Sequence, residues 1–436
     1  MIEEFDARKT VTELLSLIKH YGINDIRVKR LMLALASDPN PETARLIIKL
    51  IEPWIHYSNS FLSPFTKPAP EAVEGTIKLG FTEQGLPVGF DEMDRHVLIL
   101  GRTGVGKTTL LLMAFAQITA CKLWNAENHP YAWIFTKSVD ITELLLLQQN
   151  ILTVDFDGSV KINLLEPPDT LTFEEWAPIF ADIFIQGFRL YDGSKNFLLE
   201  HLQNLYRNSA NTGYIPSLMD FYHYIKLLRF PLASRTSRYQ ESILNRLGGL
   251  ISGNLGKVFN SSKSHIKDIS NSHCIFLISS LYSEMQVFVV NMLLAWLFYQ
   301  KSHKRIDMPE HEHFIGIDDA LLLFDISFEK RPDLGMPILH HLLATVRKAG
   351  ITLIVTAQTP SSLGSSIFSH VGLTAMMSLA DGQDIERMTR MIGIREQTQK
   401  QFCYTIPERQ AVVKMTRYPD PFVLIVPERK NAKKLV

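Results

Sequence analysis

Cysteine is scarce in this 436-residue sequence, which has three, at Cys121, Cys274 and Cys403. None belongs to a CxxC pair, whereas disulfide frameworks and cysteine-rich zinc sites require paired or closely spaced cysteines. Both kinds of scaffold are therefore excluded. We expect the three thiols to be small buried hydrophobic groups in a reducing compartment, which predicts a cytoplasmic protein.

A surplus of charge of either sign is also missing, because 45 Lys and Arg residues are balanced by 45 Asp and Glu residues. A protein that coats nucleic acid non-specifically needs a surplus of Lys and Arg to neutralise phosphates. Neutrality excludes such a polycation, but it leaves open a local basic surface that binds nucleic acid. The hydrophobic fraction of 46% is that of a globular chain and excludes a mostly disordered one.

Long hydrophobic runs are absent as well. The first ten residues, MIEEFDARKT, are acidic and polar, unlike the basic and then apolar start of a signal peptide. The most apolar stretch, 274–300, contains Glu284, Gln286 and Asn291, whereas a membrane-spanning helix needs about 20 mostly apolar residues. We therefore expect a buried strand followed by a helix in this stretch, and no membrane insertion.

Three segments differ in texture along the chain. Residues 1–57 carry apolar residues at helical spacing and a Pro-containing break at 38–41, which predicts a small N-terminal helical adaptor domain. Residues 58–76 are rich in Ser and Pro and predict a linker. Residues 77–436 predict one large domain.

Short apolar runs alternate with helical patterns through this large domain. Each run has the length and composition of a parallel strand that is buried on both faces. We predict such strands at 96–101, 132–136, 151–156, 274–279, 313–317 and 351–356. From about 169 to 268 the pattern is helical and rich in aromatic residues. The sequence thus predicts an α/β fold with a parallel sheet and an all-helical insertion.

One loop carries a complete phosphate-binding motif. Residues 101–108, GRTGVGKT, fit the pattern GxxxxGK[ST], and they follow an apolar strand and open a helix, as such a loop requires. Glycines let the backbone approach phosphate oxygens, Lys107 reaches the β- and γ-phosphates, and the Thr108 hydroxyl binds Mg²⁺. A glycine-rich turn before a buried helix is the alternative. The motif predicts binding of ATP and Mg²⁺ by Gly101, Thr103, Gly104, Val105, Gly106, Lys107, Thr108 and Thr109.

Two acidic residues, Asp318 and Asp319, end the apolar run at 313–317. Sites in α/β proteins lie at the carboxyl ends of the strands. We predict that Asp318 binds Mg²⁺ and that Asp319 positions the water that attacks the γ-phosphate. The alternative is that Asp319 only caps the following helix.

A third group of residues surrounds the last of these strands. Arg347 precedes Gly350 at a predicted helix end, and Gln358 follows the strand at its tip. Gln358 is predicted to hydrogen-bond the γ-phosphate or the attacking water, or else to be a turn residue before Pro360. Arg347 either complements the helix dipole or stabilises transition-state charge on the ATP of a neighbouring subunit.

At this point the residues resemble the HerA/FtsK superfamily of ring-forming P-loop ATPases, which includes TraG-like coupling proteins of conjugation. The resemblance covers about residues 77–430. The segment at 347–363 best distinguishes this superfamily from other P-loop proteins. It rests on HVLILGRTGVGKTTLLL at 96–112, KINLLEPP at 161–168, FIGIDDA at 314–320, RKAGITLIVTAQTPSSL at 347–363 and PDPFVLIVPE at 419–428. The resemblance implies a RecA-like P-loop ATPase core, with Gln358 as sensor and Arg347 as a finger that acts in trans.

Three features depart from the pattern of that superfamily. Asp318-Asp319 stands where its members usually have Asp-Glu, and this difference leaves open whether the chain hydrolyses ATP at the full rate. The second strand ends in Thr136-Lys137, where an acidic residue and Lys are usual. The N-terminal segment, 1–70, matches neither the β-barrel nor the membrane helices found in members of the superfamily.

The resemblance also implies a partner, because such proteins generally form hexameric rings that thread DNA through a central pore. We therefore predict a homo-oligomer, a hexamer by resemblance, that moves double-stranded DNA. Candidate pore residues are Lys226, Arg229, Arg235, Arg238, Lys257, Lys263 and Lys267. A solvated surface is the alternative for each of them. The rival function is a nucleotide-gated oligomeric scaffold that recruits a nuclease or another effector without translocation.

Overall fold

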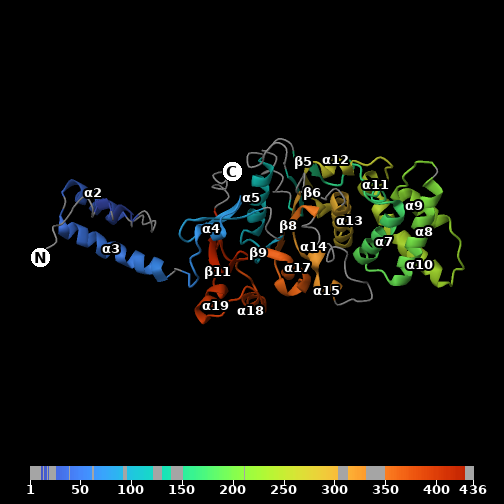
Figure 1. The fold of residues 1–436 in the computed structure, drawn as a ribbon. Helices are drawn as coiled ribbons and strands as arrows, with labels where there is room; N and C mark the ends of the chain where they lie inside the picture. Colours follow the sequence, from blue (N-terminus) through green and yellow to red (C-terminus); the bar gives the residue numbers. More distant parts are fainter. Residues whose placement is uncertain are drawn as a thin grey trace. The chain divides into compact units, whose positions relative to one another are not determined.

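The chain divides into two units, Met1–Pro64 and Phe65–Val436, in a computed structural model (Figure 1). The residues that the structure describes are 11–12, 14–16, 18, 26–38, 40–60, 63–91, 96–120, 130–138, 151–210, 212–302, 313–329 and 349–427. The larger unit contains the phosphate-binding motif, and the smaller unit contains the predicted adaptor.

A pair of helices, α2 (Ile26–Ser37) and α3 (Pro41–Ser60), forms most of the described part of the smaller unit. They are separated at the predicted break, where the Asn40 side-chain oxygen accepts a hydrogen bond from the Glu42 amide at 2.8 Å. The proline that begins α3 has a fixed φ that suits the first position of a helix. The buried residues of this unit are Leu14, Val28, Met32, Leu35, Ala44, Ile47 and Ile51.

Part of the predicted linker, 58–76, packs within the larger unit. Phe65 is buried, and its ring meets that of Phe402 edge to face with the centroids 5.6 Å apart. A short helix, α4 (Pro70–Val73), follows. Residues from Phe65 onward are therefore part of the larger unit, while the functional division of the chain stays a prediction.

The larger unit is built on one sheet. Within the described residues, its strands in order across the sheet are β2 (Pro87–Phe90), β1 (Ile77–Thr82), β11 (Tyr418–Ile425), β10 (Gln410–Met415), β9 (Val371–Met376), β3 (His96–Leu100), β8 (Ile351–Ala357), β7 (His313–Asp318), β4 (Tyr131–Thr136), β6 (His273–Leu277) and β5 (Ile151–Val154). The strands from β9 to β5 run parallel, and the remaining strands pair antiparallel. The predicted α/β fold with a parallel sheet is confirmed, and the antiparallel strands extend it at one edge.

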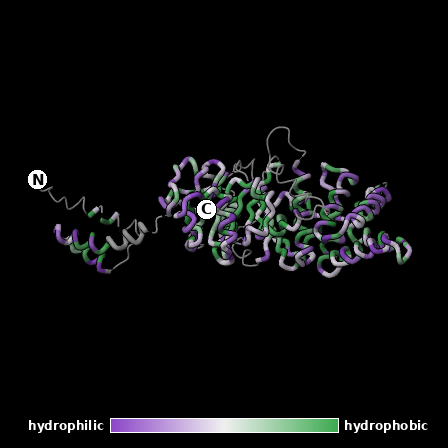
Figure 2. Tube along the Cα trace, turned by 90° about the horizontal axis from the view of Figure 1, so that it is seen from below, coloured by the Kyte–Doolittle hydropathy of each residue, from purple (hydrophilic) through white to green (hydrophobic). Residues whose placement is uncertain are grey.

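Apolar residues cover both faces of the central strands. In β3, Val97 and Ile99 contribute to the same core as helix α5 (Lys107–Thr119), whereas Leu98 and Leu100 contribute to the other core. Successive side chains of a strand point to opposite faces, so this alternation is that of a strand buried on both sides. Figure 2 shows hydrophobic segments running through the interior of this unit.

Helices fill the chain between β5 and β6, which confirms the all-helical insertion of the predicted fold. They are α7 (Phe173–Gly187), α8 (Asp192–Ala210), α9 (Leu218–Leu227), α10 (Arg235–Ile251), α11 (Gly253–Phe259) and α12 (Ile266–Ser270). Helices α7 to α10 gather at one end of the unit, away from α5 (Figure 1). The other described helices are η1 (Ile278–Ser280), α13 (Ser283–Ser302), α14 (Leu321–Phe324), α15 (Ile326–Glu329), η4 (Pro360–Ser362), α17 (Ser365–His370), α18 (Gly382–Met391) and α19 (Gln397–Tyr404).

Helix α13 contains most of the apolar stretch of the sequence and is buried along most of its length. Its Gln286 side chain donates to the carbonyls of Ile278 and Leu281 at 2.9 and 2.8 Å, which satisfies a buried polar group. In the part of the chain that the structure describes, no helix has both the length and the apolar composition that crossing a membrane requires.

Three consecutive carbonyls, of residues 164–166, hold the base of the insertion. They lie in the KINLLEPP segment and each accepts a hydrogen bond from a buried aromatic side chain. The bonds are Trp176 Nε1 to Leu164 at 3.1 Å, Tyr206 OH to Leu165 at 2.7 Å and Trp296 Nε1 to Glu166 at 3.1 Å. Since the donors come from α7, α8 and α13, this segment joins the insertion to the core.

Replacing Tyr206 by phenylalanine is expected to destabilise this junction by about 1 to 3 kcal/mol, because the buried Leu165 carbonyl loses its partner. Burial raises the pKa of Tyr206, so its hydroxyl stays a donor at neutral pH. Urea unfolding of the Tyr206→Phe variant measures the loss. Tyr282→Phe is the control, because Tyr282 is exposed. Equal unfolding free energies for both variants would contradict the assignment.

Candidate nucleotide-binding site

The phosphate-binding motif forms a tight loop between β3 and α5. Gly104 and Gly106 have φ angles of 84° and 106°, which residues with a Cβ rarely adopt. At Gly101, an added Cβ would lie 2.7 Å from Val105 Cγ2 and 3.0 Å from Met377 Cβ. The backbone therefore requires glycine at these positions of the motif.

Lys107 begins α5 and turns its ammonium group back into the loop. Its Nζ donates to the Arg102 carbonyl at 2.8 Å, and the side chain is buried. Burial lowers the pKa of Lys107, while the negative charges of Asp318 and Asp319 oppose the shift. A buried ammonium group beside the unsatisfied amides of a helix N-terminus favours an anion such as phosphate.

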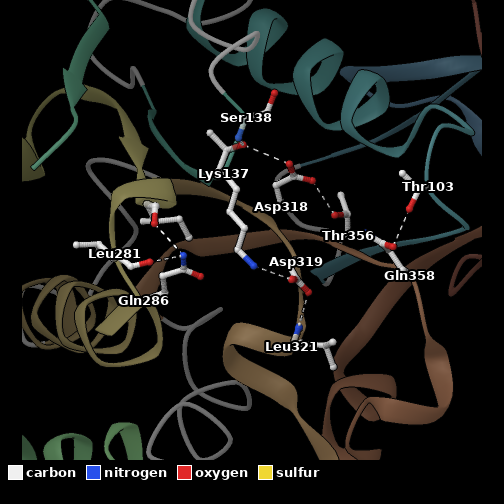
Figure 3. Close-up of polar contacts among 12 residues, drawn as sticks. Thr103, Lys137, Ser138, Leu281, Gln286, Asp318, Asp319, Leu321, Thr356 and Gln358 are labelled. Atoms are coloured by element: carbon white, nitrogen blue, oxygen red, sulfur yellow. Dashed lines mark hydrogen bonds and ion pairs between the residues drawn. The ribbon is translucent and has the colours of Figure 1, made fainter. Parts of the chain in front are cut away.

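Asp318 ends β7 and accepts hydrogen bonds from the hydroxyls of Thr108, Thr136 and Thr356. Thr356 and Thr108 donate to Oδ1 at 3.1 and 3.2 Å, and Thr136 donates to Oδ2 at 3.2 Å. Figure 3 shows the pair formed by Asp318 and Thr356. Thr136 ends β4 and Thr356 is the last but one residue of β8. Both strands flank β7 in the sheet, so the two hydroxyls reach the same carboxylate. This network fixes Asp318 beside the first turn of α5.

Asp319 follows in a strained conformation, with a φ angle of 144° that non-glycine residues rarely adopt. Its Oδ1 accepts from the Leu321 amide at 3.2 Å, and its Oδ2 forms an ion pair with Lys137 Nζ at 3.1 Å (Figure 3). The Leu321 contact satisfies the first amide of α14, whose N-cap residue is Ala320, so Asp319 stands one residue before the cap. A cap alone does not account for the strained backbone or for the ion pair with Lys137.

Gln358 lies just beyond β8 and reaches the phosphate-binding loop. Its Oε1 accepts a hydrogen bond from the Thr103 hydroxyl at 2.9 Å (Figure 3). The residue is exposed, so a ligand in the loop can contact its amide group. Arg347, the predicted finger, lies outside the described residues.

These side chains surround one cavity of about 500 Å³. Its lining is Thr103, Gly104, Gly106, Lys107, Thr108, Thr109, Lys137, Ser138, Asp318, Asp319, Thr356, Ala357 and Gln358. Segments that are more than 200 residues apart in the sequence meet here, since Thr108 and Asp318 are separated by 210 positions.

The oxygens of this cavity fit a hard cation. Thr108 Oγ1 and Asp318 Oδ1 lie 3.2 Å apart, and hydroxyl and carboxylate oxygens are the donors that Mg²⁺ prefers. Among the described residues, no group of three or more His, Cys, Asp and Glu side chains is placed to hold a metal ion. Such a group is not required for Mg²⁺, because this ion commonly binds only one or two protein side chains and completes its coordination with water and phosphate oxygens.

Among the residues that line the cavity or hold its carboxylates, Thr136, Lys137, Ser138, Thr356 and Ala357 carry no predicted role, and three of them contact the aspartates. Thr136 and Thr356 bind Asp318, and Lys137 binds Asp319. Thr136, Lys137 and Thr356 lie within one residue of the carboxyl end of a strand beside β7. The sequence signal for the two threonines is a polar residue at the end of an apolar run, but it does not say that these runs lie beside β7 in the sheet.

The candidate pore residues are all exposed and lie on or near the insertion. They are Lys226 in α9, Arg229 after it, Arg235 and Arg238 in α10, Lys257 in α11, Lys263 after it and Lys267 in α12. Lys267 is ion-paired with Asp169 at 2.5 Å, so part of its charge is compensated within the chain.

A glycine loop between a parallel strand and a helix, with an aspartate at the end of another strand of the same sheet, one strand removed, defines a RecA-like P-loop NTPase fold. Solved structures share this fold with the chain. One is VirB4 of Thermoanaerobacter pseudethanolicus, at 14% identity and a TM-score of 0.61, covering 82% of this chain and 98% of that one.

The bacterial conjugative coupling protein TrwB is a second structural relative. Its TrwBdeltaN70 form with sulphate gives 13% identity and a TM-score of 0.61, covering 84% of this chain and 95% of that one. No family model and no curated protein matches the chain. The fold expected from the resemblance to HerA/FtsK-type ATPases is therefore confirmed.

Proposed function

We propose that the chain is an ATPase whose active site is the cavity at the carboxyl ends of β3, β4, β7 and β8. The observation that carries the proposal is that Lys107, Asp318, Asp319 and Gln358 converge on one space. TrwB, which has the same fold, has been solved with a non-hydrolysable GTP analogue and with ADP and Mg²⁺. These complexes support ATP and Mg²⁺ as the ligands of this chain.

The phosphate-binding loop would hold the β- and γ-phosphates. Lys107 leaves the Arg102 carbonyl and binds phosphate oxygens, and the amides at the start of α5 bind the same anion. Thr108 and Asp318 would hold Mg²⁺, and the hydroxyls of Thr136 and Thr356 keep the Asp318 carboxylate in place. When bound, Mg²⁺ neutralises charge on the phosphates.

Hydrolysis would use Asp319 and Gln358, which line the same cavity. Asp319 positions a water molecule for in-line attack on the γ-phosphorus, and the bond between this atom and the β–γ bridging oxygen breaks. Gln358, held by Thr103, orients the water or the γ-phosphate. Arg347 of a neighbouring subunit stabilises the charge that develops on the transferred group.

The motor function follows from coupling this chemistry to DNA. We propose an oligomeric ring, a hexamer by resemblance, in which ATP hydrolysis moves double-stranded DNA through the pore. The exposed basic residues of the insertion supply charge for backbone contacts, and a neutral chain can supply such charge locally. The likeness in fold to TrwB, a bacterial conjugative coupling protein, supports the proposal of a DNA-moving motor.

Duplex DNA is expected to raise the rate of ATP hydrolysis severalfold at low salt, and the stimulation is expected to fall as salt rises, because phosphate contacts release counterions. Phosphate release measured with and without duplex DNA, over a salt series, tests this. Alanine replacement of Arg235 and Arg238 together should weaken the stimulation while the rate without DNA is kept. Slow turnover that DNA leaves unchanged would argue against a motor.

A nucleotide-gated scaffold is the second candidate, and Asp319 favours it. Both of its carboxylate oxygens are engaged in the structure, and aspartate reaches less far than glutamate. Such a protein would bind ATP, assemble and recruit an effector such as a nuclease without moving DNA. ATP-dependent assembly with flat, slow turnover on DNA would favour this candidate over the motor.

A further inference from the structure

We propose that Lys137 senses the terminal phosphate of the nucleotide by exchanging partners. It binds Asp319 when that phosphate is absent and binds the phosphate when it is present. The inference rests on the proposed ATPase function and assigns a role to a residue that the phosphate motif does not contain.

The placement of Lys137 supports this role. It follows β4 directly, and its side chain runs along the cavity to Asp319, where Nζ lies 3.1 Å from Oδ2 (Figure 3). Lys137 lines the same cavity as Lys107 and Thr108. A lysine in the wall of the cavity that the phosphate loop also lines can meet the terminal phosphate of a bound nucleotide.

The strength of the ion pair allows an exchange. The side chains of Lys137 and Asp319 are 46% and 29% exposed, and pairs this accessible to water contribute about 1 kcal/mol or less. A phosphate group offers several charged oxygens and forms stronger charge-assisted hydrogen bonds. Lysine also has a long, flexible side chain and three donors, so it changes partners without a backbone movement.

The exchange would change the hydrogen-bond partners of Asp319 as well as those of Lys137. In the structure, Oδ1 accepts from the Leu321 amide and Oδ2 is held by Lys137. Release of Lys137 frees Oδ2 to accept a hydrogen bond from water, while the Leu321 contact keeps the carboxylate oriented. The catalytic carboxylate would therefore become available only when a terminal phosphate is there to be cleaved.

The test compares binding of ADP with binding of a non-hydrolysable ATP analogue. Replacing Lys137 by methionine is expected to weaken binding of the analogue roughly tenfold, because one charge-assisted hydrogen bond to the terminal phosphate is lost. The affinity for ADP should stay unchanged. The Lys137→Arg variant, which keeps the positive charge, should keep most of the preference for the analogue over ADP. Lys195→Met is the matched control, because Lys195 forms an ion pair of similar exposure with Asp182 in the insertion, outside the cavity lining.

A double-mutant cycle separates partner exchange from simple charge repulsion. Asp319→Asn removes the competitor for Lys137, so it should strengthen binding of the analogue. In the Lys137→Met background this gain should shrink, because only the repulsion between carboxylate and phosphate remains. Equal gains in both backgrounds would overturn the exchange.

The outcomes also separate this inference from the proposed function. If the unmodified protein binds neither nucleotide, both are wrong. If it binds both and Lys137→Met changes neither, or changes ADP as much as the analogue, the Lys137 inference fails while the ATPase proposal stands. Circular dichroism of each variant checks that the fold is kept.

Discussion

Replacing Lys107 by alanine is expected to lower ATP turnover by roughly a hundredfold or more, because the motif relies on this side chain to bring positive charge to the β- and γ-phosphates. The structure explains why the loss should be large. Lys107 is buried at the start of α5, and its ammonium group lies inside the loop, within 2.8 Å of the Arg102 carbonyl. Phosphate release and binding of a fluorescent nucleotide measure the two parts of the effect.

The stability of the Lys107→Ala variant provides a control. Burial lowers the pKa of Lys107, which means that the folded protein without nucleotide holds this charge at a cost. Removing it should leave the melting temperature without nucleotide unchanged or higher, while nucleotide no longer raises it. Turnover equal to that of the unmodified protein would refute the assignment of the phosphate site.

Replacing Arg347 by alanine is expected to leave nucleotide binding intact and to lower turnover by roughly a thousandfold, which is typical for the loss of an arginine finger. The expectation comes from the sequence, since Arg347 lies outside the described residues. Nucleotide titration and single-turnover hydrolysis separate binding from chemistry.

Mixing two inactive variants tests whether the site is shared between subunits. In an Arg347→Ala and Lys107→Ala mixture, some interfaces pair an intact phosphate loop with an intact finger, so partial activity should return. Normal hydrolysis by Arg347→Ala alone would show that the finger assignment is wrong. An absence of recovery on mixing, with both variants folded and oligomeric, would place the arginine in its own subunit's site.

The local part of the candidate site could be predicted because it is contiguous. The loop from Gly101 to Thr108 has glycines at fixed spacing between an apolar strand and a helix, and this pattern alone dictates a tight turn with free amides. The Gly104 and Gly106 conformations agree with that expectation. Alternation of short apolar runs with helical patterns likewise predicted the parallel sheet and its insertion.

The contacts that β4 and β8 make with the aspartates of the site could not be predicted from contiguous sequence patterns. Thr136 and Thr356 are single polar residues at the ends of two apolar runs, and nothing in their own segments says that β4 and β8 both neighbour β7. The antiparallel pairing of β9, β10, β11 and β1 was missed for a related reason, since it depends on partners outside each strand's own segment.

Asp319 shows what the sequence determines and what only the tertiary structure decides. The sequence by itself determined that two carboxylates follow a buried strand and that a phosphate-binding loop begins a helix, because both are patterns of neighbouring residues. Only the tertiary structure decided that Lys137 reaches Asp319 while three hydroxyls hold Asp318. Strand order is fixed by packing across the whole sheet, and it brings together side chains such as Thr136 and Asp318, which are 182 positions apart along the chain.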